Sequence, residues 1–463
     1  MFKKCKKLCI TPSAYPYPSY LLHHGRFNIL FSVLIGACVT TLSGCERLPR
    51  SPISAPATSN NELIINKPVV ATDLPKSTQQ LACEQLQAGQ VVTITGHTVL
   101  APQCDLTGKG VQFVLDSSDT SLNCNGAILS SNAATDSKSA ITIRPRADKA
   151  IKDITVANCH IQGYGHALHI RQKTNPNSRY SKGLTNPDSN RALAPHDIRV
   201  INVTSNGSKN SGIFVGDHVH HVSFDQLQVV RSGTVGLYLE FGSQHNTIQN
   251  SVFVDNGFRS FKPNREAIAV DSSAFNTIQN NKFVHNGAGS IHLYRNCFEH
   301  ANDPSRSNYF KRTESASDNI IEGNTFRDEP VAVWVASRQS RNLKGFECGA
   351  YPLAKTAFAS YHIDSAKHNL IKDNTFIQVE SGIIIEDDGT QISGNDFSQV
   401  GGVAIKVGSE IRERYASDQK GEQAGLHAGI QHTVIHSNVF DATQSRDDQV
   451  RISKASQQGT QFK

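Results

Sequence analysis

A short alternation of apolar and polar positions recurs through the second half of the chain. The pattern Asn-x-Ile-x-x-Asn-x-Phe occurs in full at residues 276–283, 319–326 and 369–376, and looser copies begin at 246, 390 and 433. Its apolar positions predict short strands with one buried face, and its Asn and Gly residues predict turns between them. The copies begin 21 to 50 residues apart. Such spacing is typical of a solenoid with loops inserted into some coils.

A third strand follows most copies, and its apolar positions indicate which side chains face outward. In six aligned segments the second and fourth positions are Ile, Val or Leu, so the third and fifth positions are expected to face out. The third positions form one outward column: Phe214, Tyr238, Ala269, His292, Trp334 and Ile384. The fifth positions form a second column: Gly216, Glu240, Asp271, Tyr294, Ala336 and Glu386. We name these two columns the outward stripe.

The pattern therefore predicts one all-β domain over residues 79–455, followed by a frayed tail over 456–463. No segment has a sustained helical period. Phenylalanines at one repeat position are expected to stack inside the coils: Phe253, Phe283, Phe326, Phe376, Phe397 and Phe440. Asparagines at another position tolerate left-handed turns and are expected to form a structural hydrogen-bonded ladder: Asn281, Asn324, Asn374, Asn395 and Asn438.

This arrangement resembles the right-handed parallel β-helix of the pectate-lyase-like superfamily over about residues 90–445. The opening segment 113–130 (FVLDSSDTSLNCNGAILS) is also similar to the entry coils of that superfamily. The resemblance implies a single-domain solenoid with long loops beside one sheet. The superfamily contains lyases, epimerases, hydrolases and non-enzymatic binders, so the resemblance implies the fold and leaves the activity open.

Residues 1–45 have the composition of a secretory signal. They contain five basic residues and no acidic one, and the 14-residue apolar run 29–42 lies at their end. The tetrapeptide LSGC that ends at Cys45 resembles the bacterial lipoprotein box, which implies acylation of this cysteine. We therefore expect an exported protein that is lipid-anchored in the bacterial cell envelope, at the outer membrane, with an unstructured tether over 46–78.

The charge balance argues against a nucleic-acid partner. Without residues 1–45, 41 basic residues stand against 40 acidic ones, so the net charge of +6 comes mostly from the signal. No later segment is apolar enough to cross a bilayer. We expect a monomer that meets a membrane through its lipidated cysteine.

Six cysteines follow the lipoprotein box, an even number that suggests disulfides in an exported chain. Their order suggests the pairs Cys83–Cys104, Cys124–Cys159 and Cys297–Cys348, out of 15 possible pairings. Metal ligation by cysteine is not favoured, because no Cys-x-x-Cys spacing occurs.

The outward stripe collects aromatic, acidic and basic side chains, whereas a plain solvated face usually carries Ser, Thr, Lys and Asn. The longest insertions leave the same rungs, at residues 296–318, 339–368 and 409–432. Loops that project from a rigid scaffold often carry function. We expect these insertions to wall a groove along the stripe, with a disulfide joining two of them.

The stripe suits proton transfer on an anionic, uronate-containing polysaccharide, by β-elimination or C5 epimerisation. Such a site must neutralise the sugar carboxylate and supply a base and an acid. Arg265, Arg295 and Arg338 are candidate carboxylate clamps. His292 and Tyr294 are the candidate base and acid.

Two other classes of function remain open. Glu240 and Asp271 occupy adjacent rungs, about 5 Å apart if the coils stack directly. This spacing suits the paired carboxylates of a retaining glycoside hydrolase, and it also suits a Ca²⁺ site. The third reading is a non-catalytic lipoprotein that binds polysaccharide. In each reading Tyr238 and Trp334 offer flat faces to sugar rings, with Glu266 beside them.

A further short motif weakens one of these activities. Pro195, His196 and Asp197 are similar to the Asp-Pro-His-Asp motif of alginate epimerases, but Ala194 replaces its first Asp. The segment also opens a coil outside the central stripe. This departure argues against epimerisation in particular and favours a turn before a strand.

Overall fold

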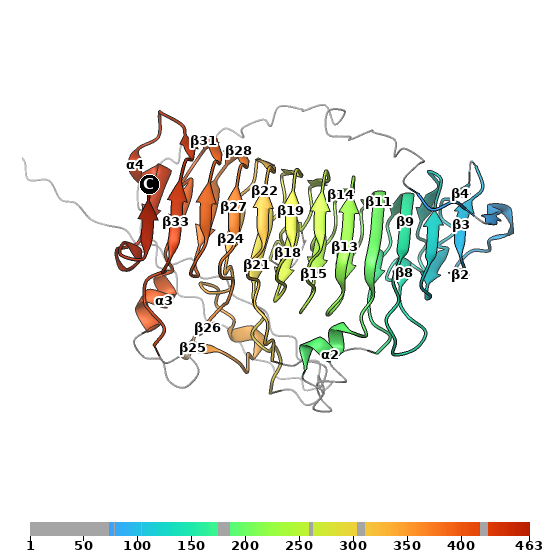
Figure 1. The fold of residues 1–463 in the computed structure, drawn as a ribbon, viewed down its shortest axis with the longest axis horizontal. Coiled ribbons are helices and arrows are strands. Elements are labelled where there is room, and N and C mark those ends of the chain that lie inside the picture. Colours follow the sequence, from blue (N-terminus) through green and yellow to red (C-terminus); the bar gives the residue numbers. More distant parts are fainter. Residues whose placement is uncertain are drawn as a thin grey trace, which may run out of the picture. The chain divides into compact units, whose positions relative to one another are not determined.

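Parallel pairing of short strands winds the chain into a stack of coils (Figure 1). The computed structural model describes residues 74–77, 79–102, 104–174, 186–258, 263–302, 311–416 and 425–463. Cys45, the expected signal 1–45 and residues 46–73 of the expected tether lie outside the described residues. The described part is a right-handed parallel β-helix, as the repeat predicted. No helix in it is long and apolar enough for a membrane span.

One face of the coils is a 12-stranded parallel sheet, which carries the outward stripe. Its strands are β2 (Val91–Ile94), β5 (Gln112–Leu115), β8 (Ser139–Ile143), β10 (His166–Ile170), β12 (Ile213–Val215), β15 (Leu237–Leu239), β18 (Ile268–Asp271), β21 (Ile291–Tyr294), β24 (Val331–Val335), β29 (Ser381–Ile385), β32 (Ile405–Val407) and β35 (Val450–Ile452).

The other two faces join into a 22-stranded sheet, because two long strands run through both of them. The first strand of each coil is among β1 (Gln79–Leu81), β3 (His97–Leu100), β6 (Thr120–Asn123), β9 (Ile154–Gln162), β11 (His196–Asn206), β13 (His220–Asp225), β16 (Thr247–Gln249), β19 (Thr277–Gln279), β22 (Ile320–Glu322), β27 (Leu370–Lys372), β30 (Gln391–Ser393), β33 (Thr433–His436) and β36 (Thr460–Phe462). The second is among β4 (Asp105–Leu106), β7 (Ile128–Ser130), β14 (Gln228–Val230), β17 (Val252–Val254), β20 (Lys282–Val284), β23 (Thr325–Arg327), β28 (Thr375–Val379), β31 (Asp396–Val400) and β34 (Val439–Phe440). The strands β9 and β11 bend through both columns.

The repeat positions build two buried ladders, as predicted. The six phenylalanines of the repeat stack in sequence order with ring centroids 4.4 to 5.3 Å apart. The asparagine ladder runs from Asn281 to Asn438, and each Oδ1 accepts from the backbone N–H and the Nδ2 of the asparagine one coil earlier. A second ladder runs from Asn246 to Asn369 at the start of the repeat.

The left-handed backbone at this corner belongs to the residue before each ladder asparagine, and not to the ladder asparagine that we expected to adopt it. Asn280, Gly323 and Asp373 have φ of 55°, 63° and 56°. Glycine, asparagine and aspartate adopt this region at low cost. The corner residue thus turns the chain, which leaves the next amide free to bond between coils.

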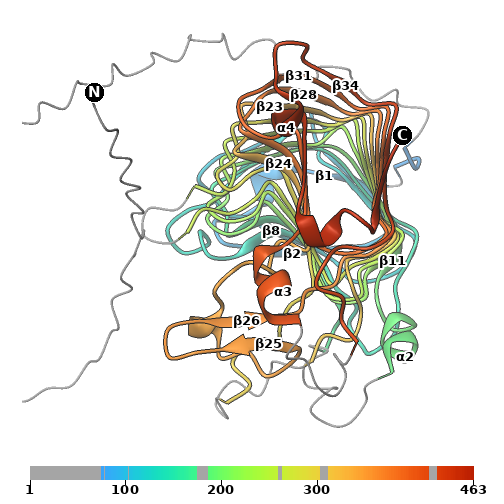
Figure 2. The ribbon, with the colours of Figure 1, turned by 90° about the vertical axis from the view of Figure 1, so that its left-hand side faces the viewer.

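The ends and insertions add little regular structure. The last coil continues to β36, which pairs with β33, so the sheet extends past residue 455 into the expected tail. The 339–368 insertion contains the antiparallel hairpin β25 (Pro352–Lys355) and β26 (Ser360–His362). The short helices are α2 (Pro187–Arg191), α3 (Glu410–Tyr415), α4 (Arg446–Gln449), η3 (Cys83–Gln85), η5 (Lys344–Phe346) and η8 (Lys454–Ser456). Seen along the stack, the hairpin, α2 and α3 all lie beyond one side of the coils (Figure 2).

The three expected disulfides are confirmed as Cys83–Cys104, Cys124–Cys159 and Cys297–Cys348. The first two tie neighbouring coils at the beginning of the stack, and the third joins two insertions. Each is expected to contribute about 2–4 kcal/mol to folding, mainly by restricting the unfolded chain.

Replacing one ladder asparagine should destabilise the fold strongly. Asn324→Ala removes the acceptor of the Asn281 amides and the donor to Ile278 O and Asn374 Oδ1. Each buried polar group left unpaired costs about 1–3 kcal/mol, so we expect a loss of about 3 kcal/mol or more in urea denaturation. The exposed Lys282→Ala should change stability by less than about 0.5 kcal/mol. Equal effects of the two changes would contradict a ladder that sets stability.

Candidate functional site

Strand pairing confirms the first column of the outward stripe. Phe214 lies opposite Tyr238, and the same register runs on through Ala269, His292 and Trp334 to Ile384. The column extends backward to His169 on β10 and forward to Lys406 on β32. In the second column Asp271 lies opposite Tyr294, and Glu240 directly follows β15. Side chains from separate coils therefore meet along one face.

The centre of the stripe is covered, whereas the sequence predicted that the insertions would wall a groove along it. The side chains of Asp271, His292 and Tyr294 are 3% exposed or less. The reason is that the insertions fold back onto the sheet. Asp364, from the 339–368 insertion, accepts the backbone N–H groups of Arg295 and Arg338 and holds both segments against the rungs.

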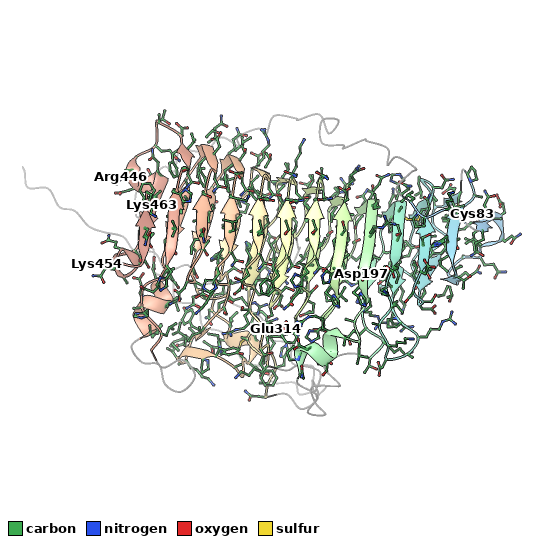
Figure 3. The ribbon with its side chains drawn as sticks, in the orientation of Figure 1. Cys83, Asp197, Glu314, Arg446, Lys454 and Lys463 are labelled. Atoms are coloured by element: carbon green, nitrogen blue, oxygen red, sulfur yellow. A yellow bond between two sulfur atoms is a disulfide. The ribbon has the colours of Figure 1, made fainter. Side chains whose placement is uncertain are left out.

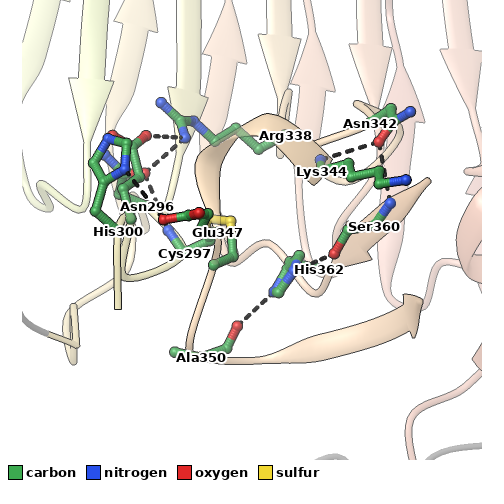
Figure 4. The surroundings of a disulfide bond; sticks show 12 residues. Asn296, Cys297, His300, Arg338, Asn342, Lys344, Glu347, Ala350, Ser360 and His362 are labelled. Carbon is green, nitrogen blue, oxygen red and sulfur yellow. Dashed lines mark hydrogen bonds and ion pairs between the residues drawn. A yellow bond between two sulfur atoms is a disulfide. The ribbon is translucent and has the colours of Figure 1, made fainter. Parts of the chain in front are cut away.

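Two of the predicted carboxylate clamps are engaged in this covering layer. Arg338 donates to Asn296 Oδ1 and pairs with Glu299, both at 2.7 Å, beside the Cys297–Cys348 disulfide (Figure 4). The guanidinium of Arg295 lies over the Tyr351 ring at 3.5 Å and donates to Ile363 O. Both side chains brace the insertions, and neither joins the others as a common clamp.

The third predicted clamp, Arg265, binds a neighbouring carboxylate. Its Nε and Nη2 donate to Glu266 at 3.1 and 2.9 Å, and Nη2 also donates to the Tyr294 hydroxyl at 3.2 Å. Burial opposes ionisation of Glu266, but the Arg265 guanidinium outweighs it and holds the pKa of that carboxyl below its usual range. Burial raises the pKa of Tyr294, so its phenol stays protonated.

His292 and Trp334 pack against each other on neighbouring rungs. Their rings meet edge to face with centroids 5.5 Å apart, and His292 Nδ1 lies 3.8 Å from Glu266 Oε2. Burial lowers the pKa of His292 to about 4 against the opposing effect of Glu266, so the imidazole is neutral near pH 7. Trp334 Nε1 is buried and makes no hydrogen bond with the described residues.

Arg341 lies beside this group and was missed by the sequence analysis. Burial lowers its pKa, and Arg338 and Arg265 lower it further, while Glu266 and Tyr294 oppose them. Its guanidinium makes no hydrogen bond or ion pair with any residue that the structure describes. The sequence contained little indication of a role for Arg341, because it is one of several polar residues at the start of a long insertion.

A second cluster gathers three carboxylates around one guanidinium. Arg312 pairs with Asp217 at 3.1 Å through Nη1 and with Glu240 at 2.7 Å through Nη2. Asp271 accepts from the Tyr238 hydroxyl at 2.6 Å and from Asn296 Nδ2 at 3.0 Å. We name Asp217, Glu240 and Asp271 the acidic cluster.

The insertion that carries Arg312 is fixed from two sides. Glu314, labelled at the loop end of the coils in Figure 3, pairs with Arg191 of α2 at 2.7 Å. The Tyr351 hydroxyl donates to Arg312 O at 2.6 Å. Asp217 had a sequence signal, because it follows Gly216 of the stripe, whereas nothing in the sequence pointed to Arg312.

The acidic cluster holds a proton at neutral pH. Burial raises the pKa of Glu240 to about 8, and the nearby Asp271 and Asp217 carboxylates add to the effect of burial against the Arg312 charge. Burial likewise raises the pKa of Asp217. Because Glu240 and Asp217 share one guanidinium, ionising both of them leaves one uncompensated negative charge in a poorly solvated site.

The arrangement does not resemble the Ca²⁺ site considered from the sequence. At Glu240 the compensating charge is the Arg312 guanidinium, and Asp271 is occupied by Tyr238, Ser272 and Asn296. The described residues contain no group of three or more His, Cys, Asp or Glu side chains placed to hold a metal ion.

An aromatic surface leads to the acidic cluster. The rings of Phe214 and Tyr238 stack with centroids 5.2 Å apart, and His169 meets Phe214 edge to face at 5.1 Å. All three are half-buried, so part of each side chain remains accessible. Flat rings in this setting suit contacts with sugar rings. The epimerase-like segment lies elsewhere, on the first strand of its coil, where His196 stacks on His220.

The chain matches a family model described as a right handed beta helix region over residues 90–308. It is similar to the catalytic domain of a GH87 α-1,3-glucanase in complex with nigerose, at 10% identity and a TM-score of 0.38, over 83% of this chain and 62% of that one. It is also similar to a tailspike protein of E. coli bacteriophage HK620 in complex with a pentasaccharide, at 11% identity and 0.37, over 74% and 51%.

An alginate lyase from a Paenibacillus species is similar at 12% identity and a TM-score of 0.37, over 69% of this chain and 95% of that one. No curated protein matches the chain in sequence. The chain spans 62% of the length of the glucanase chain. At this level of similarity the three structures carry no information on activity.

The raised pKa of Glu240 should be visible in the pH dependence of stability. The folded chain binds this proton more tightly than the unfolded chain, whose carboxyl has the ordinary value of 4.5. The stabilisation is therefore complete below pH 4.5 and is lost as the pH rises toward 8.

We expect the unfolding free energy of the wild-type chain to fall more steeply across this window than that of Glu240→Gln, as measured by urea denaturation at several pH values. Glu322→Gln, which removes the half-buried partner of Lys372 on the other sheet, should follow the wild-type slope. Parallel curves for all three proteins would show that Glu240 holds no extra proton.

Proposed function

We propose that this β-helix is a carbohydrate-active enzyme that hydrolyses glycosidic bonds of a polysaccharide at the acidic cluster. The observation that carries the proposal is the raised pKa of Glu240, to about 8, beside further carboxylates and at the end of the aromatic surface. Hydrolysis of a glycosidic bond needs one carboxylic acid that keeps its proton at the working pH and one carboxylate that remains a base.

The roles follow from accessibility and bonding. Glu240, whose side chain is 15% exposed, acts as the general acid and protonates the leaving oxygen. Asp217, with a side chain 14% exposed, acts as the base that takes a proton from the attacking water. Asp271 is fully buried and holds the Tyr238 hydroxyl, so it is a positioning residue. Arg312 fixes Glu240 and Asp217 relative to each other.

A second candidate is β-elimination or C5 epimerisation of a uronate around His292. It is favoured by the neutral imidazole beside Arg341, a cation that feels the Glu266 charge but forms no ion pair with any described residue. His292 would take the proton next to the sugar carboxylate, Arg341 would neutralise that carboxylate, and Tyr294 would supply a proton. A substrate reaches His292 and Tyr294 only if the covering insertions open, because both side chains are buried.

The purified protein should be incubated with a panel of acidic and neutral polysaccharides, and new reducing ends and unsaturated products should be measured together. We expect reducing ends without unsaturated product, and Glu240→Gln should lower kcat by about 10²- to 10⁴-fold. Glu322→Gln is the matched control and should retain the wild-type rate. Folding of each variant is checked by thermal unfolding.

Other outcomes of this assay decide between the alternatives. Unsaturated product that disappears in His292→Gln and persists in Glu240→Gln would replace hydrolysis by elimination. Binding of a glycan with no product from any member of the panel would overturn both catalytic readings and leave a polysaccharide-binding protein.

We also propose that the chain is exported and anchored to the cell envelope through Cys45, with the outer membrane as the expected location. The three disulfides support an oxidising compartment. Cys45 itself lies outside the described residues.

Cys45→Ala should move the protein from the membrane fraction to the soluble fraction, because an acyl chain provides the anchor. Cys38→Ala, within the apolar run, is the control and should remain with the membrane. Fractionation followed by detergent phase separation measures both. If Cys45→Ala stays in the membrane fraction, the apolar run itself is the anchor.

A further inference from the structure

Two arginines continue the second column of the stripe on the rungs that precede the acidic cluster. Arg144 directly follows β8 and Arg171 directly follows β10, and the last residues of these strands, Ile143 and Ile170, lie opposite each other. One rung further on is Gly216, and the next is Glu240. With rungs about 4.8 Å apart, Arg171 and Arg144 stand about 10 and 14 Å from Glu240 along the stack.

Neither guanidinium is neutralised within the described part of the chain. Arg144 and Arg171 are half-buried, and the Nε of each is buried without a hydrogen-bond partner there. Asp116, one rung earlier in the same column, has its Oδ2 bound by Arg146 Nε at 2.6 Å. Burial lowers the pKa of Arg171, and the neighbouring Arg144 charge lowers it further. Two adjacent cations in a poorly solvated place therefore lack a bound counter-charge.

The surroundings favour a sugar chain as the source of that charge. His169 lies beside the pair, and burial lowers its pKa to about 3, with His166 and both arginines acting in the same direction. The ring is therefore neutral and forms one end of the aromatic surface that leads to Tyr238. Gly216, on the rung between Arg171 and Glu240, carries no side chain, and a Cβ there would meet Ile170 O at 2.9 Å and Arg171 Cβ at 3.3 Å.

We propose that Arg144 and Arg171 form a subsite for an anionic group on the polysaccharide, three and two rungs from Glu240. The substrate class is then an acidic polysaccharide that bears a carboxylate, sulfate or phosphate. Guanidinium groups bind such anions through charge-assisted, often bidentate hydrogen bonds. The distance to the cleaved bond rests on the proposed hydrolysis at Glu240, whereas binding of the anion does not.

The test uses the full chain carrying Glu240→Gln, so that binding is measured without turnover. Calorimetric titration compares uronate oligosaccharides, sulfated oligosaccharides and neutral oligosaccharides of matched length. We expect one acidic class to bind, and added Arg144→Gln or Arg171→Gln to weaken it about tenfold each, the order expected when one charge-assisted hydrogen bond is lost. Neutral oligosaccharides should lose no affinity.

Arg231→Gln is the matched control, because this arginine is exposed, follows β14 on the other sheet and donates to Asn206 Oδ1 at 2.8 Å. It should change the affinity less than twofold. The melting temperature separates binding from a structural role, since removing one of two like charges should leave it unchanged or raised.

The proposal is overturned if acidic glycans bind the Arg144→Gln and Arg171→Gln variants as tightly as the parent, or if no acidic glycan binds the parent. If the acidic glycan binds as expected but the wild-type protein, which retains Glu240, does not hydrolyse it, the proposed reaction is overturned and the anion subsite stands.

Discussion

Hydrogen bonds between stacked asparagine amides set the register on which the rest of this chain depends. Each ladder amide bonds to the backbone of one coil and to the amide of the next, so a coil cannot slip without leaving several buried groups unpaired. The stacked phenylalanines fill the interior but are alike from coil to coil, and their packing alone would tolerate a slip. The amides therefore decide which side chains of distant segments share a column. The outward stripe, and every proposal built on it, follows from that register.

The same rigid face creates an electrostatic problem that the insertions resolve locally. Side chains on one column lie only a rung apart, so charges from separate coils are forced together. Where an insertion supplies an opposite charge, as Arg312 does for Glu240, the carboxyl groups are held in place but one proton is retained. Where no insertion supplies one, as at Arg144 and Arg171, cations remain without a partner among the described residues. The proton retained at Glu240 supports the proposed hydrolysis. The unpaired cations Arg144 and Arg171 support an acidic substrate.

The candidate site was predicted in part. Strand alternation placed Glu240, Asp271 and His292 on the correct face, because outward positions follow directly from the apolar pattern. Strand alternation could not predict the contacts of Arg295 and Arg338, because both lie just after strand ends, where the chain enters loops. The apolar pattern does not describe the course of those loops. These arginines brace the insertions, and the covering of the central stripe has the same origin.

By itself the sequence determined the coil, its three strands and its two ladders, and the order of the cysteines suggested the disulfide pairs. The coil, strands and ladders are encoded by short-range periodicity and by equivalent residues that repeat along the chain. Only the tertiary structure decided which of the outward groups are buried and which charge meets which. Those properties arise where insertions from different coils pack over one sheet, and free energies of burial and pairing depend on contacts between residues far apart in sequence. Arg312 reaches Asp217 and Glu240 across 95 and 72 residues, and no local pattern carries that information.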